Sequence, residues 1–126
     1  MKHRKLTIPI LISTLLLITL LAACGSSEPE DRIFNLEIHD GTLVQGNPPL
    51  VVNQNDEVTI VVSSDQPVSF HLHGYDIEQE AEPGGPATLA FIANATGSFP
   101  FTIHIQESDG DHEGEEIELG RLDVRP

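Results

Sequence analysis

Residues 68–76 read Val68-Ser69-Phe70-His71-Leu72-His73-Gly74-Tyr75-Asp76. Apolar residues stand two apart at the start of this segment, and successive side chains of a β-strand point to opposite faces. Val68, Phe70 and Leu72 are therefore predicted to face a core. His71 and His73 fall on the opposite face. The pattern indicates a strand that is buried on one side and carries two imidazoles on the other.

A second segment has the same alternation and reads Phe99-Pro100-Phe101-Thr102-Ile103-His104-Ile105. Its aromatic and branched residues form the apolar face, and His104 lies opposite them. If the two strands are neighbours in one sheet, His71, His73 and His104 converge outside the core. Neutral imidazole is a ligand for both Cu(II) and Zn(II), so the spacing predicts a metal site. The alternative is three solvated side chains on a polar strand face.

Period-two patterning continues through the chain and is interrupted by turn residues. Further strands are predicted at residues 33–39, 50–53, 58–62, 87–93 and 117–124. Asp40-Gly41 is a hairpin turn signal after the first of these. No stretch keeps helical spacing for three turns. The chain is therefore predicted to be all-β, an antiparallel Greek-key sandwich of about seven to eight strands.

The N-terminus predicts an export signal at residues 1–23. Basic residues precede an uncharged apolar run from Leu6 to Leu21, and small residues follow it before Cys24. The run is short for a permanent membrane span. The ending Leu21-Ala22-Ala23-Cys24 closely resembles the lipobox of bacterial lipoproteins, in which the cysteine is acylated. This resemblance implies a lipid anchor at Cys24 on the extracytoplasmic face of a cell membrane or envelope.

The charge and the cysteine content of the chain exclude some classes of function. Three of the six basic residues precede Cys24 and all 20 acidic residues follow it, so the chain from Cys24 onward carries a formal charge of −17. Such a chain repels nucleic acid. Cys24 is the only cysteine and Met1 the only methionine. Once Cys24 is acylated, the exported domain has no sulfur ligand for a metal.

After the signal, the chain is predicted to consist of a tether at residues 24–31 and one domain at residues 32–126. This domain resembles a cupredoxin. The likeness covers residues 51–126. Its specific part is the segment His71-Leu72-His73-Gly74-Tyr75-Asp76. Weaker parts are the turn at 53–56, the Gly-x-Phe-x-Phe run at 97–101 and the closing Gly-x-Leu-x-Val strand at 119–124.

The resemblance implies copper, but not the blue-copper site of the family. That site uses two histidines, a cysteine and usually a methionine, and its thiolate sets the colour and the redox tuning. The first histidine carries over to His73 or to His71. The cysteine position falls at Ile103, or at His104 if the strand has a bulge. Copper would therefore bind through nitrogen ligands, completed by water or a carboxylate, and zinc is the alternative metal.

Residues near the histidines add weaker candidates. His112 is a possible fourth ligand, although its loop is polar and a solvated side chain is the simpler interpretation. Asp76 would fix the tautomer of a ligand histidine, and Tyr75 belongs either to the core or to the surroundings of the site. Residues 109–114 match a calcium loop only in part, because position twelve is Gly120.

Three functions remain open from the sequence. The first is a membrane-tethered, cupredoxin-like copper-binding module for copper handling or accessory redox chemistry, with another envelope or redox protein as partner. The second is a metal-free sandwich that binds a protein of the envelope. The third, an oxidoreductase with type 2 copper, has the least support. No phosphate loop or nucleophile motif is present, so the sequence favours a binding protein over an enzyme.

Overall fold

A computed structural model describes residues 28–47, 49–105 and 116–126 of the chain. Within these ranges it contains nine strands and no helix. The strands are β1 (Asp31–His39), β2 (Thr42–Leu43), β3 (Leu50–Asn53), β4 (Glu57–Ser64), β5 (Val68–Leu72), β6 (Ile77–Ala81), β7 (Ala87–Ile92), β8 (Gly97–Ile105) and β9 (Glu116–Arg125). No helix of the described residues is long and apolar enough to cross a bilayer.

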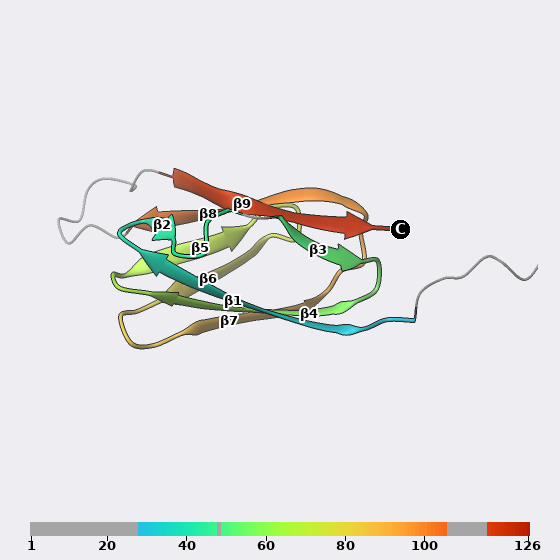
Figure 1. Cartoon of the computed structure of the whole chain (residues 1–126), viewed down its shortest axis with the longest axis horizontal. Coiled ribbons are helices and arrows are strands. Elements are labelled where there is room, and N and C mark those ends of the chain that lie inside the picture. Colours follow the sequence, from blue (N-terminus) through green and yellow to red (C-terminus); the bar gives the residue numbers. More distant parts are fainter. Residues whose placement is uncertain (1–27, 48, 106–115) are drawn as a thin grey trace, which may run out of the picture.

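The strands form two sheets packed face to face, seen as upper and lower layers in Figure 1. One sheet has the order β2-β1-β4-β7 and the other the order β3-β9-β8-β5-β6. The all-β sandwich predicted from the sequence is confirmed. Strands β5 and β8, which carry the histidine segments, are hydrogen-bonded neighbours, so the condition for convergence of the imidazoles is met.

Both sheets are mixed, which corrects the expectation of a purely antiparallel sandwich. β1 pairs in parallel with β4, and β3 pairs in parallel with β9. The chain leaves the first sheet after β2, forms β3 in the second sheet and returns as β4. β2 and β3 run in the same direction, opposite to β1, and the chain reverses again at the turn between β3 and β4 (Figure 1), so β4 comes back parallel to β1. The remaining ladders are antiparallel.

The core lies between the sheets and consists of the inward side chains of both. Val68, Phe70 and Leu72 are fully buried, as their alternation predicts. The rings of Phe70 and Phe101 stack with centroids 5.5 Å apart, joining β5 to β8 inside the sandwich. Removing such apolar surface from water is the main stabilising contribution to a sheet sandwich. The opposite face of β5 and β8 is left outside the core.

Two short strands were not predicted. β2 has two residues, and its hairpin with β1 turns at Asp40-Gly41, where both residues have positive φ, 49° and 72°. This is the backbone of a type I′ turn, which the Asp-Gly pair favours. β6 has three polar residues at its centre, Glu78, Gln79 and Glu80. It is an edge strand, and its alternation is too weak to mark it in the sequence.

A β-bulge in β9 decides which of its side chains face outward. Phe101 lies opposite Gly120 and Thr102 opposite Glu118, so Leu119 is the extra residue. Gly120 is required there, since a Cβ at this position would lie 2.7 Å from Cζ of the buried Phe101 ring. A one-residue bulge reverses the alternation of the strand on one side. Glu116 therefore points away from the core.

Asp56 fastens the start of β1 to the turn before β4. Its side chain is completely buried. Its carboxylate accepts hydrogen bonds from the backbone N–H of Glu30 at 3.0 Å and of Asn53 at 2.8 Å, and Arg32 Nε lies 3.4 Å away. The hydrogen bond from the Asn53 N–H is the main cause that lowers the pKa of Asp56. The hydrogen bond from the Glu30 N–H and the hydrogen bond and charge of Arg32 lower this pKa further, while burial opposes the shift. The segment entering from the N-terminus is thus held at this turn.

Candidate metal centre

Polar side chains from three strands meet on the outer face of the five-stranded sheet. In the register of β5 and β8, His71 lies opposite Thr102 and Ser69 opposite His104. In the register of β8 and β9, His104 lies opposite Glu116. Directly opposed and diagonal residues on one sheet face are close enough for long side chains to touch. The face therefore gathers imidazoles and carboxylates from segments distant in sequence.

Three of these side chains form one donor cluster. A ring nitrogen of His71, a ring nitrogen of His73 and a carboxylate oxygen of Glu116 all lie within 4.8 Å of one another. His73 Nε2 is 2.9 Å from Glu116 Oε1. The rings of His71 and His73 have centroids 4.1 Å apart. Metal–nitrogen and metal–oxygen bonds of about 2 Å place donors roughly 3 to 4 Å apart, so small side-chain movements would let one ion reach all three.

Thr102 forms the floor of this cluster. It is 5% exposed, and its Oγ1 lies 3.0 Å from His73 Nε2. The hydrogen bond between Thr102 and Glu116 is the main cause that lowers the pKa of the Glu116 carboxyl. The hydrogen bond and charge of His73 and the charge of His104 lower this pKa further. A carboxylate that is ionised at a lower pH is available to a cation over a wider pH range. Thr102 thus holds two donors in place.

His104 stands at the edge of the cluster. Its Nε2 lies 4.0 Å from Glu116 Oε1, and its side chain is 36% exposed. The structure thus places His71, His73 and His104 on one face around a shared carboxylate. His71 and His73 are in the donor cluster with Glu116, and His104 adjoins it. A shallow depression of about 330 Å³ opens over the same place, lined by His73, Pro100, Thr102, Glu116 and Glu118.

The other candidates from the sequence lie at different places. Asp76 Oδ1 is 3.7 Å from His71 Nε2, beyond hydrogen-bonding distance, and its side chain is almost fully exposed. Tyr75 packs on Phe91 and Phe99, and its hydroxyl donates to the Ala95 carbonyl at 3.1 Å. These contacts assign Tyr75 to the packing of the sandwich.

Several predictions fall on residues that the structure does not describe. They are the signal at residues 1–23, the lipidation of Cys24 and the possible ligand His112. The partial calcium loop at residues 109–114 lies there too. Each of these stays a prediction.

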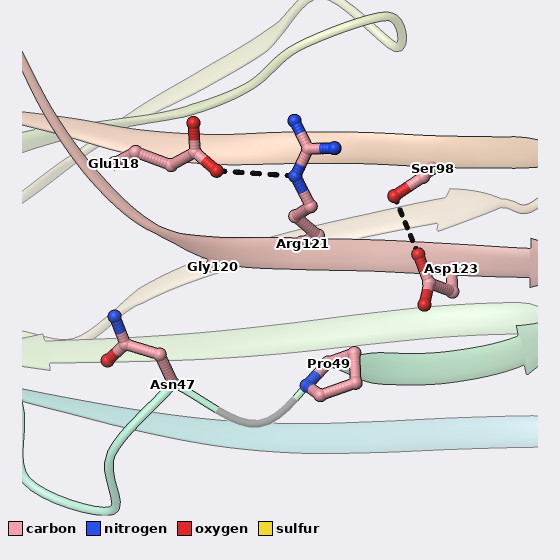
Figure 2. Close-up of a pocket in the computed structure, with 7 residues that line it drawn as sticks. All are labelled: Asn47, Pro49, Ser98, Glu118, Gly120, Arg121 and Asp123. Carbon is pink, nitrogen blue, oxygen red and sulfur yellow. Dashed lines mark hydrogen bonds and ion pairs between the residues drawn. The ribbon is translucent and has the colours of Figure 1, made fainter.

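A second depression, of about 420 Å³, borders the cluster and is shown in Figure 2. Its lining residues are Asn47, Pro49, Ser98, Glu118, Gly120, Arg121 and Asp123. Its charged groups are already paired, since Arg121 Nε lies 3.3 Å from Glu118 Oε1 and Ser98 Oγ donates to Asp123 Oδ1 at 2.7 Å. It has no imidazole, and a cation already contacts Glu118. The donor chemistry for a metal is therefore in the neighbouring cluster.

Glu116 is the site residue that the sequence analysis missed. It is one of 20 acidic residues, and no local motif distinguishes it. One signal was available, because Ile117 and Leu119 alternate out of phase with Leu122 and Val124. That change of phase indicates a bulge and places Glu116 on the outer face. Pairing β9 with the His104 strand would then have put the carboxylate beside the imidazoles.

The donor set fits Cu(II) or Zn(II) and does not fit a blue-copper centre. Two imidazoles and a carboxylate are borderline and hard ligands, and the described residues contain no cysteine or methionine. Ile103, where the family's cysteine would fall, is fully buried in the core. His104, the other position considered, is on the outer face. The thiolate bond that defines a blue-copper site is therefore absent from the described residues.

No protein-family model matches the chain, and no curated protein matches it. Solved structures do. A chain of a heme-copper terminal oxidase dimer matches with a TM-score of 0.54 and 17% identity, over 93% of this chain and 92% of that one. The fold is cupredoxin-like.

Two oxidases match over a smaller share of their own length. A multicopper oxidase matches with a TM-score of 0.55 and 19% identity, over 76% of this chain and 42% of the oxidase chain. The blue copper oxidase from Nitrosomonas europaea matches with a TM-score of 0.54 and 19% identity, over 76% and 39%. This chain thus spans well under half of either oxidase, and the likeness concerns the fold alone.

Proposed function

We propose that this protein is a lipid-anchored, extracytoplasmic copper-binding module, in which His71, His73 and Glu116 bind the ion and His104 is an additional donor. The observation that carries the proposal is the cluster of two imidazole nitrogens and a carboxylate oxygen within 4.8 Å of one another. Copper, when bound, would supply one-electron redox chemistry or be carried as cargo. The copper oxidases among the matching structures are consistent with this choice of metal.

Copper is favoured over zinc by the general order of affinities for nitrogen and oxygen sites. The carboxylate of Glu116 neutralises part of the charge of a divalent ion. Thr102 contacts His73 and holds Glu116, so the donors are oriented before the metal arrives. Groups that orient ligands in this way commonly raise metal affinity by about 10-fold to 100-fold.

The lipid anchor at Cys24 follows from the resemblance of residues 21–24 to a lipobox, and it would place the domain at a membrane. Figure 1 shows the start of β1 and the C-terminus at one end of the molecule and the start of β9 at the other. Glu116 is the first residue of β9. A short tether attached before β1 would therefore leave the end of the sandwich where β9 begins farthest from the bilayer, accessible to a protein of the envelope.

The test is Cu(II) binding by the full chain carrying Cys24→Ser, purified in mild detergent, so that the thiol does not contribute. We expect one ion bound with sub-micromolar affinity and a paramagnetic resonance spectrum of nitrogen and oxygen ligands, without an intense thiolate absorption band. His71→Ala, His73→Ala and Glu116→Gln should each weaken binding at least about 10-fold.

The matched controls are His39→Ala and Glu57→Gln, which change an exposed histidine and an exposed carboxylate on the other sheet. They should leave the affinity within about two-fold of the parent. The proposal is wrong if no ion binds more tightly than micromolar, or if the control and cluster variants behave alike. That result would favour the metal-free interaction module.

A further inference from the structure

We infer that this site selects the oxidised, divalent ion, Cu(II), and discriminates against Cu(I). The inference rests on the proposed copper-binding function and specifies its substrate class. It would make the protein a carrier or store of copper in its divalent state. Three independent features of the outer sheet face support it.

The first feature is the hardness of the donors. Imidazole nitrogen and carboxylate oxygen suit divalent copper, whereas Cu(I) is selected by thiolate and thioether sulfur. The described residues contain neither cysteine nor methionine, and the two sulfur-containing residues of the sequence are Met1 and Cys24. In the cluster, Glu116 is the hard donor, and the ion must contact it to be held by three ligands.

The second feature is the charge around the cluster. Two more carboxylates flank its floor, because Glu78 lies opposite His71 and Glu118 opposite Thr102 in the strand registers. The electrostatic attraction of these groups for a bound ion scales with its charge, so a divalent ion gains twice as much as a monovalent one. Among the described residues, Arg121 is the cation contacting Glu118, and its guanidinium is about half exposed.

The third feature is the fixed arrangement of the donors. β8 lies between β5 and β9, and ladder hydrogen bonds hold it on both sides. Glu116 and His73 are hydrogen-bonded to each other and to Thr102. Nitrogen and oxygen donors are the ligands with which Cu(II) forms its preferred tetragonal coordination.

The experiment measures the affinity of one protein for both oxidation states. Cu(II) is titrated in air against a Cu(II) chelator. Cu(I) is titrated without oxygen, with ascorbate as reductant, against the chromophoric Cu(I) chelator bicinchoninate. The full chain with Cys24→Ser should bind Cu(II) and lose all copper to bicinchoninate on reduction. Zn(II), which is divalent and redox-inactive, should compete with Cu(II) at higher concentration.

A ligand exchange gives the sharper comparison. Glu116→Met replaces the hard donor by a thioether and should weaken Cu(II) binding at least about 10-fold while strengthening Cu(I) binding by a similar factor. Glu57→Met, at an exposed carboxylate on the other sheet, should change neither affinity by more than about three-fold. Glu116→Gln should weaken Cu(II) without gain for Cu(I), and circular dichroism checks that each variant is folded.

Distinct outcomes separate this inference from the function on which it rests. If the parent protein retains Cu(I) against bicinchoninate as strongly as it retains Cu(II), or if Glu116→Met leaves both affinities unchanged, the selectivity for Cu(II) is refuted while copper binding stands. If neither oxidation state binds, the proposed function fails and the selectivity fails with it. Weaker binding of Cu(II) together with stronger binding of Cu(I), in Glu116→Met and not in the control variant, would establish the selectivity for Cu(II).

Discussion

Replacing Asp56 by asparagine should destabilise the domain strongly, although the two side chains have nearly the same shape. The Asp56 carboxylate accepts hydrogen bonds from the N–H groups of Glu30 and Asn53 on different oxygens. The amide nitrogen of asparagine cannot accept, so one of these partly buried N–H groups loses its partner. A hydrogen bond to a charged group contributes about 1.5 to 3 kcal/mol, and an unpaired buried donor costs a similar amount.

Loss of the ion pair with Arg32 adds less than about 1 kcal/mol, because the guanidinium is 39% exposed. The expected decrease in the free energy of unfolding is therefore about 2 to 4 kcal/mol. For a domain of this size the melting temperature should fall by roughly 10 to 25 °C. Thermal unfolding followed by far-ultraviolet circular dichroism measures it.

Asp123→Asn is the matched control, since its carboxylate accepts one hydrogen bond, from Ser98, at the surface. The control should melt within about 3 °C of the parent. A melting temperature of Asp56→Asn within the same range would refute the assignment of Asp56 as the group that holds the N-terminal segment.

The pH dependence of this effect has a definite sign. The pKa of Asp56 in the folded protein is lowered from its ordinary value of 3.8. A group whose pKa is depressed by folding stabilises the protein fully above its unfolded pKa, and this stabilisation is lost as the pH falls through the folded value. The stability difference between the parent and Asp56→Asn should thus be constant from pH 7 to about pH 5 and shrink below about pH 4. A difference that grows on acidification would contradict the linkage.

Three further predictions concern the site, the bulge and the anchor. Thr102→Val should lower the affinity for Cu(II) about 10-fold to 100-fold in a chelator competition, Thr102→Ser should restore it, and both should melt near the parent temperature. Gly120→Ala should reduce the free energy of unfolding in urea by about 1 to 3 kcal/mol, because its Cβ would overlap the buried Phe101 ring, whereas Gly85→Ala, with its nearest contact at 3.8 Å, should change it little. An alkyne analogue of palmitate fed to the producing bacterium should label the chain, and Cys24→Ser should abolish the label.

The sequence carried enough information for the strands that bury a clear apolar face. Alternation in residues 68–72 and 99–105 predicted both the core residues and the outward position of His71 and His104. The hairpin turn at Asp40-Gly41 was likewise predicted from the Asp-Gly pair. These features depend on neighbouring residues, and local sequence determines them.

Features that depend on pairing between distant segments could not be predicted from the local sequence. The parallel pairing of β1 with β4 results from the path of β3 through the other sheet, which no residue in β1 or β4 encodes by itself. Glu116 became a candidate ligand only when β9 was placed beside β8. In an acidic chain, the local sequence does not distinguish a ligand carboxylate from other acidic residues until its neighbours across the sheet are known.

The bulge at Leu119 makes the metal site dependent on chain length as well as on residue identity. Inserting one residue between Ile117 and Glu118 would shift the start of the strand by one position, turn Glu116 toward the interior and bring Ile117 to the outer face beside His104. No ligand would have been substituted, yet the carboxylate would be gone from the donor set. In a sandwich of this kind, a single insertion or deletion in an edge-proximal strand can therefore create or remove a metal centre that leaves every imidazole in place.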